Sequence, residues 1–257
     1  MKRTLIASAA FTSLLVATSA FAADLPVYTK APAVAAVYDW TGYYIGTNLG
    51  YSWGRGATDG TQTIGSLVAA LTTVTPMSGR ADVNGFIGGG QLGYNWEHGA
   101  WVFGLEGDIQ FSNERGAGDV CTAACPAGYV FTRDYKLDWF GTARGRVGFL
   151  PAERILLYAT GGLAYGHFSG SSWTLPMNFG TWASTNVGWT VGAGVESALG
   201  ANWSVKLEYL YMDLGSVGGS SATVGLNKWV FDTKFTDSLV RVGLNYKFGG
   251  GPIAARY

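Results

Sequence analysis

The chain has 257 residues, a formal net charge of zero and only 13% charged residues, about half the share found in an average soluble domain. It also has 14% aromatic residues and 39 glycines. A neutral chain without a basic cluster excludes nucleic acid as a partner. Beyond the N-terminal segment, no apolar run is long enough for a membrane-spanning helix. This composition favours β-strands that face lipid.

Residues 1–22 have the pattern of a secretory signal peptide. Lys2 and Arg3 precede an uncharged apolar run that ends at Ala20, and Ala22 completes a small-residue cleavage site. A membrane-spanning helix is disfavoured because the run is short and no charge cluster follows it. We therefore expect an exported chain with its signal peptide removed.

The mature chain is expected to have three parts. Residues 23–40, which include Pro26 and Pro32, predict an extended Pro- and Ala-rich periplasmic lead-in without a core of its own. Residues 41–248 predict a barrel, and residues 249–257 form a C-terminal tail.

From Tyr43 onward, the chain resolves into eight segments in which apolar residues alternate with Gly, polar and charged residues. The apolar rows run over Tyr43–Trp53, Phe86–Trp96, Trp101–Phe111, Leu137–Phe149, Ile155–Tyr165, Val187–Val195, Trp203–Tyr211 and Val240–Phe248. Within them, every charged residue falls on the face opposite the apolar row, as a bilayer requires because a lipid-facing charge costs about 2–4 kcal/mol. A soluble sandwich would alternate in the same way. Aromatic residues near the segment ends favour the membrane.

Short and long connections alternate between these segments. The short ones are 97–99, 151–154 and 199–202; the long, Gly/Ser/Thr-rich ones are 54–83, 112–134, 169–185 and 213–236. Short periplasmic turns with long outer loops are typical of outer-membrane barrels. The sequence therefore predicts an all-β, eight-stranded antiparallel up-and-down transmembrane β-barrel, with both termini in the periplasm.

The charged residues on the inward face nearly balance in sign. In so narrow a barrel they are forced together, and an unpaired buried charge is costly. We therefore predict that a network of ion pairs fills the lumen. Its predicted members are Glu106, Asp108, Asp138, Arg144, Arg146, Glu196, Lys206, Glu208 and Arg241, with Lys136 and Lys247 also on the inward face.

Cys121 and Cys125 lie close together in a polar stretch. In an oxidising compartment this spacing favours a local disulfide. No His or acidic cluster accompanies them, so no metal site is expected.

Two further motifs are weaker. Gly88, Gly90 and Gly93 fit G-x-G-x-x-G, but a dinucleotide site needs a helix after the motif, and here the motif lies within a strand; no cofactor is expected. His167 and Ser169 could share one face of a strand, as in outer-rim lipid hydrolases. No acidic residue lies nearby in sequence to orient the base, so an interfacial histidine is the favoured interpretation.

The opening segments resemble small porin-family surface antigens, the outer-membrane immunogenic proteins of alphaproteobacteria. The resemblance rests on Asp39–Gly46 (DWTGYYIG), Gly50–Gly54 (GYSWG) and Ala23–Pro26 (ADLP). It implies an eight-stranded membrane anchor with roles in envelope integrity and surface exposure. Some relatives are described as haem binders or porins, but no motif for either property carries over to these residues.

The last segment resembles the recognition signal for barrel assembly, with Arg241, Gly243, Tyr246 and Phe248 at its characteristic positions. That signal normally ends the protein, whereas residues 249–257 follow here. We expect the assembly machinery to read the strand that ends at Phe248 and to tolerate the tail.

The sequence thus predicts a structural and surface protein of a Gram-negative outer membrane, not an enzyme. Its expected partners are outer-membrane lipid, the barrel-assembly machinery and an extracellular or host ligand at the loops. The alternatives are a narrow or gated porin for ions and small solutes, binding of haem or a host surface by the loops, and, least favoured, a lipid hydrolase.

Overall fold

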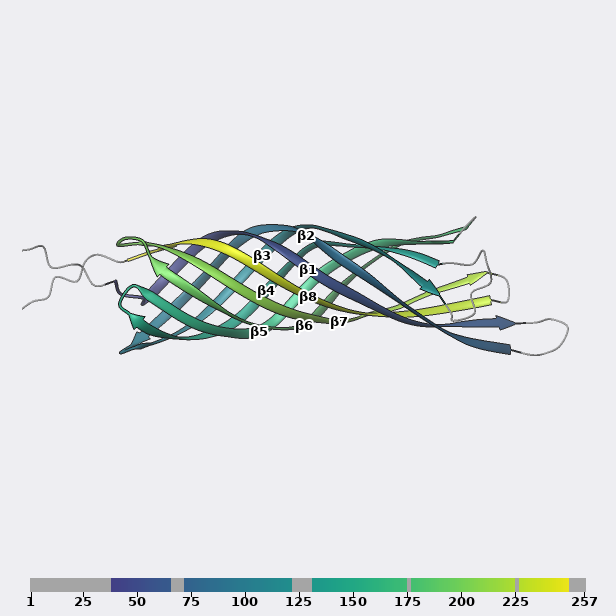
Figure 1. Cartoon of the computed structure of the whole chain (residues 1–257), viewed down its shortest axis with the longest axis horizontal. Helices are drawn as coiled ribbons and strands as arrows, with labels where there is room; N and C mark the ends of the chain where they lie inside the picture. Colours follow the sequence, from purple (N-terminus) through teal and green to yellow (C-terminus); the bar gives the residue numbers. More distant parts are fainter. Residues whose placement is uncertain (1–37, 66–71, 122–130, 175–176, 225–226, 250–257) are drawn as a thin grey trace, which may run out of the picture. The chain divides into compact units, whose positions relative to one another are not determined.

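The computed structural model describes residues 38–65, 72–121, 131–174, 177–224 and 227–249. These residues form eight antiparallel strands, each paired with the next along the chain, and β8 pairs with β1 to close a barrel (Figure 1). The strands are β1 Gly42–Gly65, β2 Thr72–His98, β3 Trp101–Cys121, β4 Phe131–Ala152, β5 Ile155–Thr174, β6 Met177–Ala198, β7 Trp203–Val224 and β8 Asn227–Lys247. Over the described residues, no helix has the length and apolar character needed to cross a bilayer. The predicted fold class is confirmed.

One part of the barrel carries an apolar outer surface with aromatic residues at both ends. Close ring pairs such as Trp203–Tyr246 and Trp101–Phe149 lie near the short turns, and Tyr51–Phe86 lies at the other end. We call the strand segments between these ends the spanning segments: 43–53, 86–96, 101–111, 139–149, 155–165, 187–197, 203–211 and 238–248. Each has about nine to eleven residues, the length of a tilted strand that crosses a bilayer.

The strands continue well beyond the spanning segments. β1 and β2 stay paired up to Gly65–Thr72, and β7 and β8 up to Val224–Asn227. Much of each connection that was expected to be a long loop is therefore paired strand, which corrects that expectation. A hairpin outside the bilayer needs no apolar outward row, so the alternating signal fades from the sequence while the backbone pairing persists.

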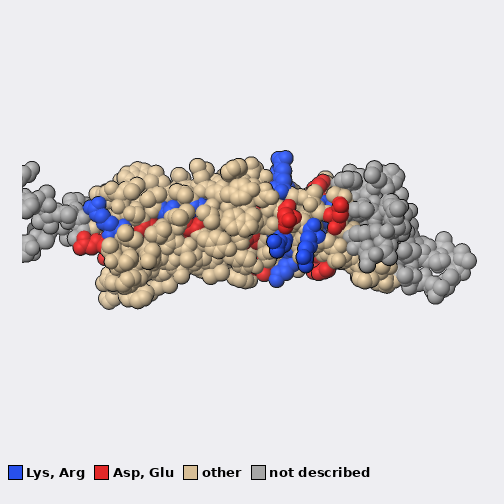
Figure 2. All heavy atoms as spheres, viewed as in Figure 1, with Lys and Arg blue, Asp and Glu red and all other residues tan. Residues whose placement is uncertain are grey.

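In this long-hairpin part, the two faces of the wall exchange their chemistry. In β2, Ala81 and Val83 point inward and are buried, while Arg80, Asp82 and Asn84 are exposed on the outside. Figure 2 shows charged side chains gathered in a band on the outer surface, on the long-hairpin side of the uncharged lipid-facing wall. The long-hairpin part is thus built like a water-soluble barrel, with a largely apolar interior and a polar exterior.

Candidate functional site: the filled lumen

The centre of the lumen is an ion-pair cluster between β3, β4, β7 and β8. Arg144 lies 3.1 Å from Asp108 Oδ2 and 3.1 Å from Glu208 Oε1, and it also donates to Glu106. Arg241 Nη2 lies 3.0 Å from Asp108 Oδ2 and 2.6 Å from Glu208 Oε2. Each of these two arginines therefore bridges carboxylates from different strands and ties the walls together across the lumen.

A second tier extends this cluster toward the short turns. Lys206 Nζ lies 2.8 Å from Glu106 Oε2, and Arg146 Nη1 lies 3.0 Å from Glu196 Oε2. Glu196 also accepts a hydrogen bond from Asn245 Nδ2 at 2.8 Å. Each carboxylate in this tier has more than one donor, which offsets the cost of removing its charge from water.

We call the eight charged residues of these two tiers the charged plug. All of them point inward and are buried: Glu106, Asp108, Arg144, Arg146, Glu196, Lys206, Glu208 and Arg241. Four are acidic and four are basic, so the plug is neutral as a whole. The alternation in the sequence placed these residues on one face, and the structure brings them together in a single network.

Two tyrosines complete the plug, and the sequence reasoning did not identify them. Tyr44 donates to Glu106 Oε2 at 2.7 Å, and Tyr158 donates to Glu208 Oε1 at 2.9 Å. Their rings occupy space that glycines leave free, because a Cβ on Gly93 would lie 2.4 Å from the Tyr44 ring and one on Gly194 would lie 2.6 Å from the Tyr158 ring. A tyrosine opposite a glycine across a strand pair was the available signal.

The lumen is also filled at the short-turn end. Tyr38 and Trp40, from the predicted lead-in, pack inside the barrel; Trp40 is 1% exposed. The Trp40 backbone donates to Glu97 Oε2 at 2.7 Å, and its indole donates to the Glu153 carbonyl at 3.2 Å. Lys247 Nζ lies 5.0 Å from the centre of the Tyr38 ring. We call Tyr38 and Trp40 the aromatic stopper; with it, the end of the expected lead-in joins the barrel core.

Beyond the plug, toward the long hairpins, the interior is an apolar cluster that we call the outer core. Phe168 and Phe235 pack against each other within it, with ring centres 4.5 Å apart. Its members are Ala81, Val83, Ile87, Tyr135, Leu137, Phe140, Ala164, Phe168, Leu210, Met212, Leu214, Phe235 and Leu239. The lumen therefore contains three successive fillings: aromatic, charged and apolar.

Asp138 does not join the plug, which corrects the prediction from the sequence. Its carboxylate pairs with Lys136 and accepts a hydrogen bond from Ser169 at 2.6 Å, and the Asp138 side chain is 26% exposed. The strand register shifts between Phe111 and Glu114 on one side of β4 and between Leu137 and Trp139 on the other. These irregularities turn Leu137 into the outer core and leave Lys136 and Asp138 outside the lumen.

His167 and Ser169 do not form a nucleophile and base. The His167 ring stacks on Trp139 and its Nδ1 lies 2.9 Å from Thr185 Oγ1, whereas Ser169 donates to Asp138. Asp138 is thus an acidic residue close in space, but it accepts the hydrogen bond of the Ser169 hydroxyl directly. His167 is bonded to Thr185 and not to that hydroxyl. This geometry lacks the hydrogen bond that would activate the serine.

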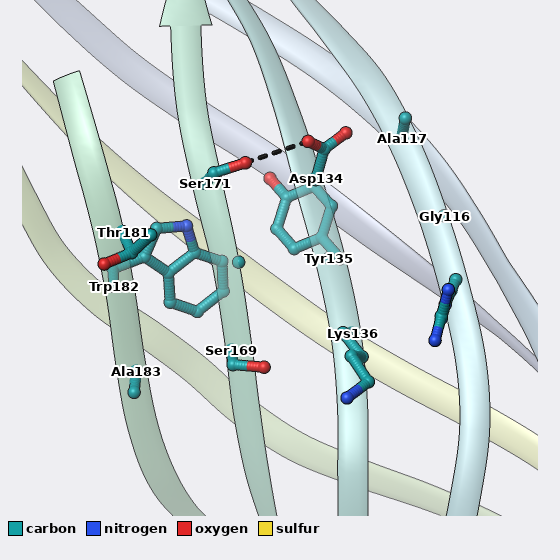
Figure 3. A pocket seen from close by; sticks show the side chains of 12 residues that line it. Gly116, Ala117, Asp134, Tyr135, Lys136, Ser169, Ser171, Thr181, Trp182 and Ala183 are labelled. Carbon is teal, nitrogen blue, oxygen red and sulfur yellow. Dashed lines mark hydrogen bonds between the residues drawn. The ribbon is translucent and has the colours of Figure 1, made fainter. Parts of the chain in front are cut away.

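Ser169 lines an outer-wall pocket of about 920 Å³ between β3 and β6. Figure 3 shows Ser169, Lys136 and Trp182 around it, and the hydrogen bond from Ser171 to Asp134. His167 is not among its lining residues. The pocket is a hollow in the wall without the constellation of a hydrolase.

The predicted assembly residues divide between the two faces of β8. Arg241 belongs to the plug, and a Cβ on Gly243 would lie 3.1 Å from the Lys206 side chain. Tyr246 and Phe248 lie on the outer side, with ring centres 5.3 Å apart. Residues 250–257 lie outside the described residues, as do the signal peptide and Cys125, so the disulfide with Cys121 stays a prediction.

The sequence comparisons with known proteins agree on one class. The family model described as "Outer membrane protein beta-barrel domain" matches residues 9–248. The 31 kDa outer-membrane immunogenic protein of Brucella melitensis is 39% identical, covering 96% of this chain and 100% of the relative. The 25 kDa outer-membrane immunogenic protein of Brucella abortus is 31% identical over 96% of this chain and 99% of the relative. Among solved structures, OprG from Pseudomonas aeruginosa has a TM-score of 0.45 and 16% identity over 82% of this chain and 98% of that chain.

Proposed function

The chain belongs to the outer membrane protein β-barrel domain family. We propose that in the outer membrane it acts as a closed, non-conducting and non-catalytic barrel that presents four long hairpins. The resemblance predicted from its opening segments is confirmed, and the chain is an outer-membrane surface protein. The two Brucella relatives are named as immunogenic proteins, not as enzymes. The finer proposal concerns what the barrel does in the membrane.

The charged plug carries this proposal. A diffusion pore needs a continuous path of water, and its lining charges face that water. In this lumen the eight plug charges face one another, with Arg144 and Arg241 bonded across the barrel. The aromatic stopper and the outer core fill the lumen on either side. The barrel therefore works as an anchor and contributes to envelope integrity by adding a rigid, sealed cylinder.

The three short turns and residue Tyr38 lie at the same end of the barrel, and we infer that this end faces the periplasm. Short turns on the periplasmic side are typical of outer-membrane barrels. The long hairpins then project from the cell, where their charged exterior meets water. An epitope tag after Tyr257 is expected to be inaccessible to antibody on intact cells, while amine labelling reaches Lys234, whose side chain is 60% exposed.

The test of closure is single-channel recording of the refolded full-length chain in planar bilayers. We expect no conductance typical of a wide porin for the natural chain. Arg144→Ala, which unpairs carboxylates inside the plug, is expected to introduce or raise conductance, because water enters to solvate them. The matched control is Val242→Ala, since Val242 lies on the outward face of β8 and is 52% exposed. A natural chain that already conducts like a water-filled porin would replace the anchor with the pore alternative.

A further inference from the structure

One pair of neighbouring strands separates in the long-hairpin part. β6 and β7 pair only from Ala198–Ser204 to Trp189–Asp213, and beyond that point no described residue of one strand pairs with the other. Yet β5 and β6 stay paired to Thr174–Met177, and β7 and β8 to Val224–Asn227. Figure 1 shows the green β5–β6 hairpin parting from the yellow-green β7–β8 hairpin. We call residues 177–188 of β6 and 214–224 of β7 the seam.

Gly215 is where β7 leaves β6. Its φ is +69°, a backbone conformation that L side chains rarely adopt, and its N–H donates to Asp213 Oδ1 at 3.0 Å. The register between β7 and β8 shifts at the same place, between Asp213 and Ser216. At the base of the seam, Asn186 Nδ2 donates to the Ser216 carbonyl at 2.7 Å. A side-chain hydrogen bond thus replaces the backbone ladder between β6 and β7 at this point. The bulge in β7 directs this strand away from β6.

The unpaired backbone groups of β6 can be assigned. At the short-turn end, Ala198 N donates to Arg154 O on the β5 side, and Leu199 N donates to Trp203 O on the β7 side. In an antiparallel sheet these directions alternate along a strand, and the β5–β6 register is regular from Ser197 back to Gly180. The β6 residues whose N–H and C=O point into the seam are therefore Thr181, Ala183, Thr185 and Val187.

Both edges of the seam lack the usual protection of an exposed edge. Natural proteins block such edges with charged residues and proline because open N–H and C=O groups attract further strands. Neither 177–188 (MNFGTWASTNVG) nor 214–224 (LGSVGGSSATV) contains Asp, Glu, Lys, Arg or Pro. By contrast, the long-hairpin part of β8, which pairs with both β1 and β7, carries residues such as Lys228 and Lys234. The charge is absent where an edge is open.

We propose that the seam is a docking site for an extended, uncharged segment of another polypeptide, which adds as a strand between β6 and β7. A single strand between the two edges can form main-chain hydrogen bonds with both. A second copy of the barrel is a less suitable occupant, because its closed wall cannot enter between two strands of the same sheet. Main-chain hydrogen bonds would supply the affinity, and the neutral edges would select a segment without charge. The inference goes beyond the closed-anchor function and rests only on the long hairpins being outside the cell.

The test uses the refolded full-length chain and a fluorescein-labelled peptide that copies residues 181–188 (TWASTNVG). We expect fluorescence anisotropy to show binding, and hydrogen exchange to show that both seam edges become protected together when peptide is added. A version of the peptide N-methylated at alternate residues loses the donors of one edge, so its affinity should fall about tenfold. This comparison leaves the protein unchanged and does not depend on the folding of a variant.

A matched pair of variants tests the seam-facing edge of the protein. Thr185→Pro removes an N–H that points into the seam while sparing the β5 side, so binding should weaken about tenfold. Thr185→Ala loses the same hydroxyl but keeps the N–H and should bind as the natural chain does. Absence of binding, or equal binding of the N-methylated peptide, would overturn the proposal. The proposal would also be overturned if, without peptide, the seam edges were protected from hydrogen exchange to a degree that rises with protein concentration. A second copy of the chain would then fill the seam.

Discussion

The two halves of the barrel fill their interiors in opposite ways. In the spanning half, the lumen holds the charged plug and the outer wall is apolar; in the long-hairpin half, the lumen holds the outer core and the outer wall is charged. The same alternation of side chains continues through both halves. What changes is the surrounding medium, since lipid on the outside drives charge inward and water on the outside allows the usual apolar core.

Neighbouring positions on two strands show this change. In β3, Ile109 faces lipid and Asp108 faces the plug, whereas in β2, Asp82 faces outward and Val83 lies in the outer core. Asp108 is paired with arginines where it is buried, and Asp82 is solvated where it is exposed, so these two carboxylates are satisfied by different means. The two halves should therefore respond differently to substitution.

The largest expected effect is in the charged plug. Arg144→Met removes the cation that bonds to Glu106, Asp108 and Glu208, and leaves these carboxylates short of a partner in a buried site. Removing one partner of a buried ion pair costs about 3–5 kcal/mol, and water entering the lumen lowers that cost toward the smaller value. The free energy of unfolding, measured in urea with refolded protein in detergent, should fall accordingly.

The control for this variant is Leu244→Ala on the lipid-facing side of β8. This side chain is 43% exposed and takes no part in the plug. If both variants lost equal stability, the plug would contribute nothing specific, and the spanning half would be held together by its wall alone.

A more local effect is expected in the outer core. Phe235→Ala removes a fully buried ring that packs 4.5 Å from Phe168, a truncation that costs about 3–5 kcal/mol in a rigid core. Because the long-hairpin half can open while the spanning half stays folded, we expect faster hydrogen exchange in residues 227–237 and unchanged exchange in 238–247. Uniformly faster exchange in both halves would show that they unfold as one unit.

The sequence predicted the spanning half well because lipid imposes a strict rule there. Every charged residue of a spanning segment must turn inward, so alternation alone placed Arg144, Arg146 and Arg241 on the plug side. The alternation could not predict which carboxylate each arginine contacts. Partners such as Glu208 come from strands distant in the sequence, and their position depends on the stagger between strands. The long-hairpin half has no such rule. There, Gly/Ser/Thr-rich strands read as loops, and the irregularity beside Leu137 reversed the expected direction of Asp138.

A buried acid pair just beyond the spanning segments should make the long-hairpin half sensitive to pH. Ser112 donates to Glu114 Oε1 at 3.0 Å, and Ser52 donates to Asp237 Oδ2 at 2.5 Å. Burial, together with the neighbouring Asp237 carboxylate, raises the pKa of Glu114 to about 9, and burial raises the pKa of Asp237 to about 7. Both acids hold their protons more tightly in the folded chain than in the unfolded chain.

The sign of the pH effect follows from these raised pKa values. The contribution of the two acids to stability is complete below the unfolded pKa of about 4 and is lost as the pH rises through about 7 and toward 9. We expect the melting temperature, followed by tryptophan fluorescence, to fall between pH 5 and pH 9, and Glu114→Gln to reduce that fall. Glu153→Gln, in an exposed turn, should leave the slope as it is. An unchanged slope in Glu114→Gln would show that the acid pair does not cause the loss of stability with rising pH.

The smallest expected effect separates the two kinds of carboxylate most sharply. Asp138 pairs with Lys136 on a partly exposed outer surface, whereas Asp108 is bound by Arg144 and Arg241 inside the plug. An exposed ion pair contributes about 0–1 kcal/mol, because water solvates either charge when the other is removed. Asp138→Asn should therefore change the free energy of unfolding by less than about 1 kcal/mol, while Asp108→Asn, measured in the same urea titration, should cost several times more. Because the chemical change is the same at both positions, the difference in stability loss shows whether each carboxylate lies inside or outside the barrel wall. A large loss for Asp138→Asn would instead place that carboxylate inside the lumen, and the charged filling would then extend into the long-hairpin half.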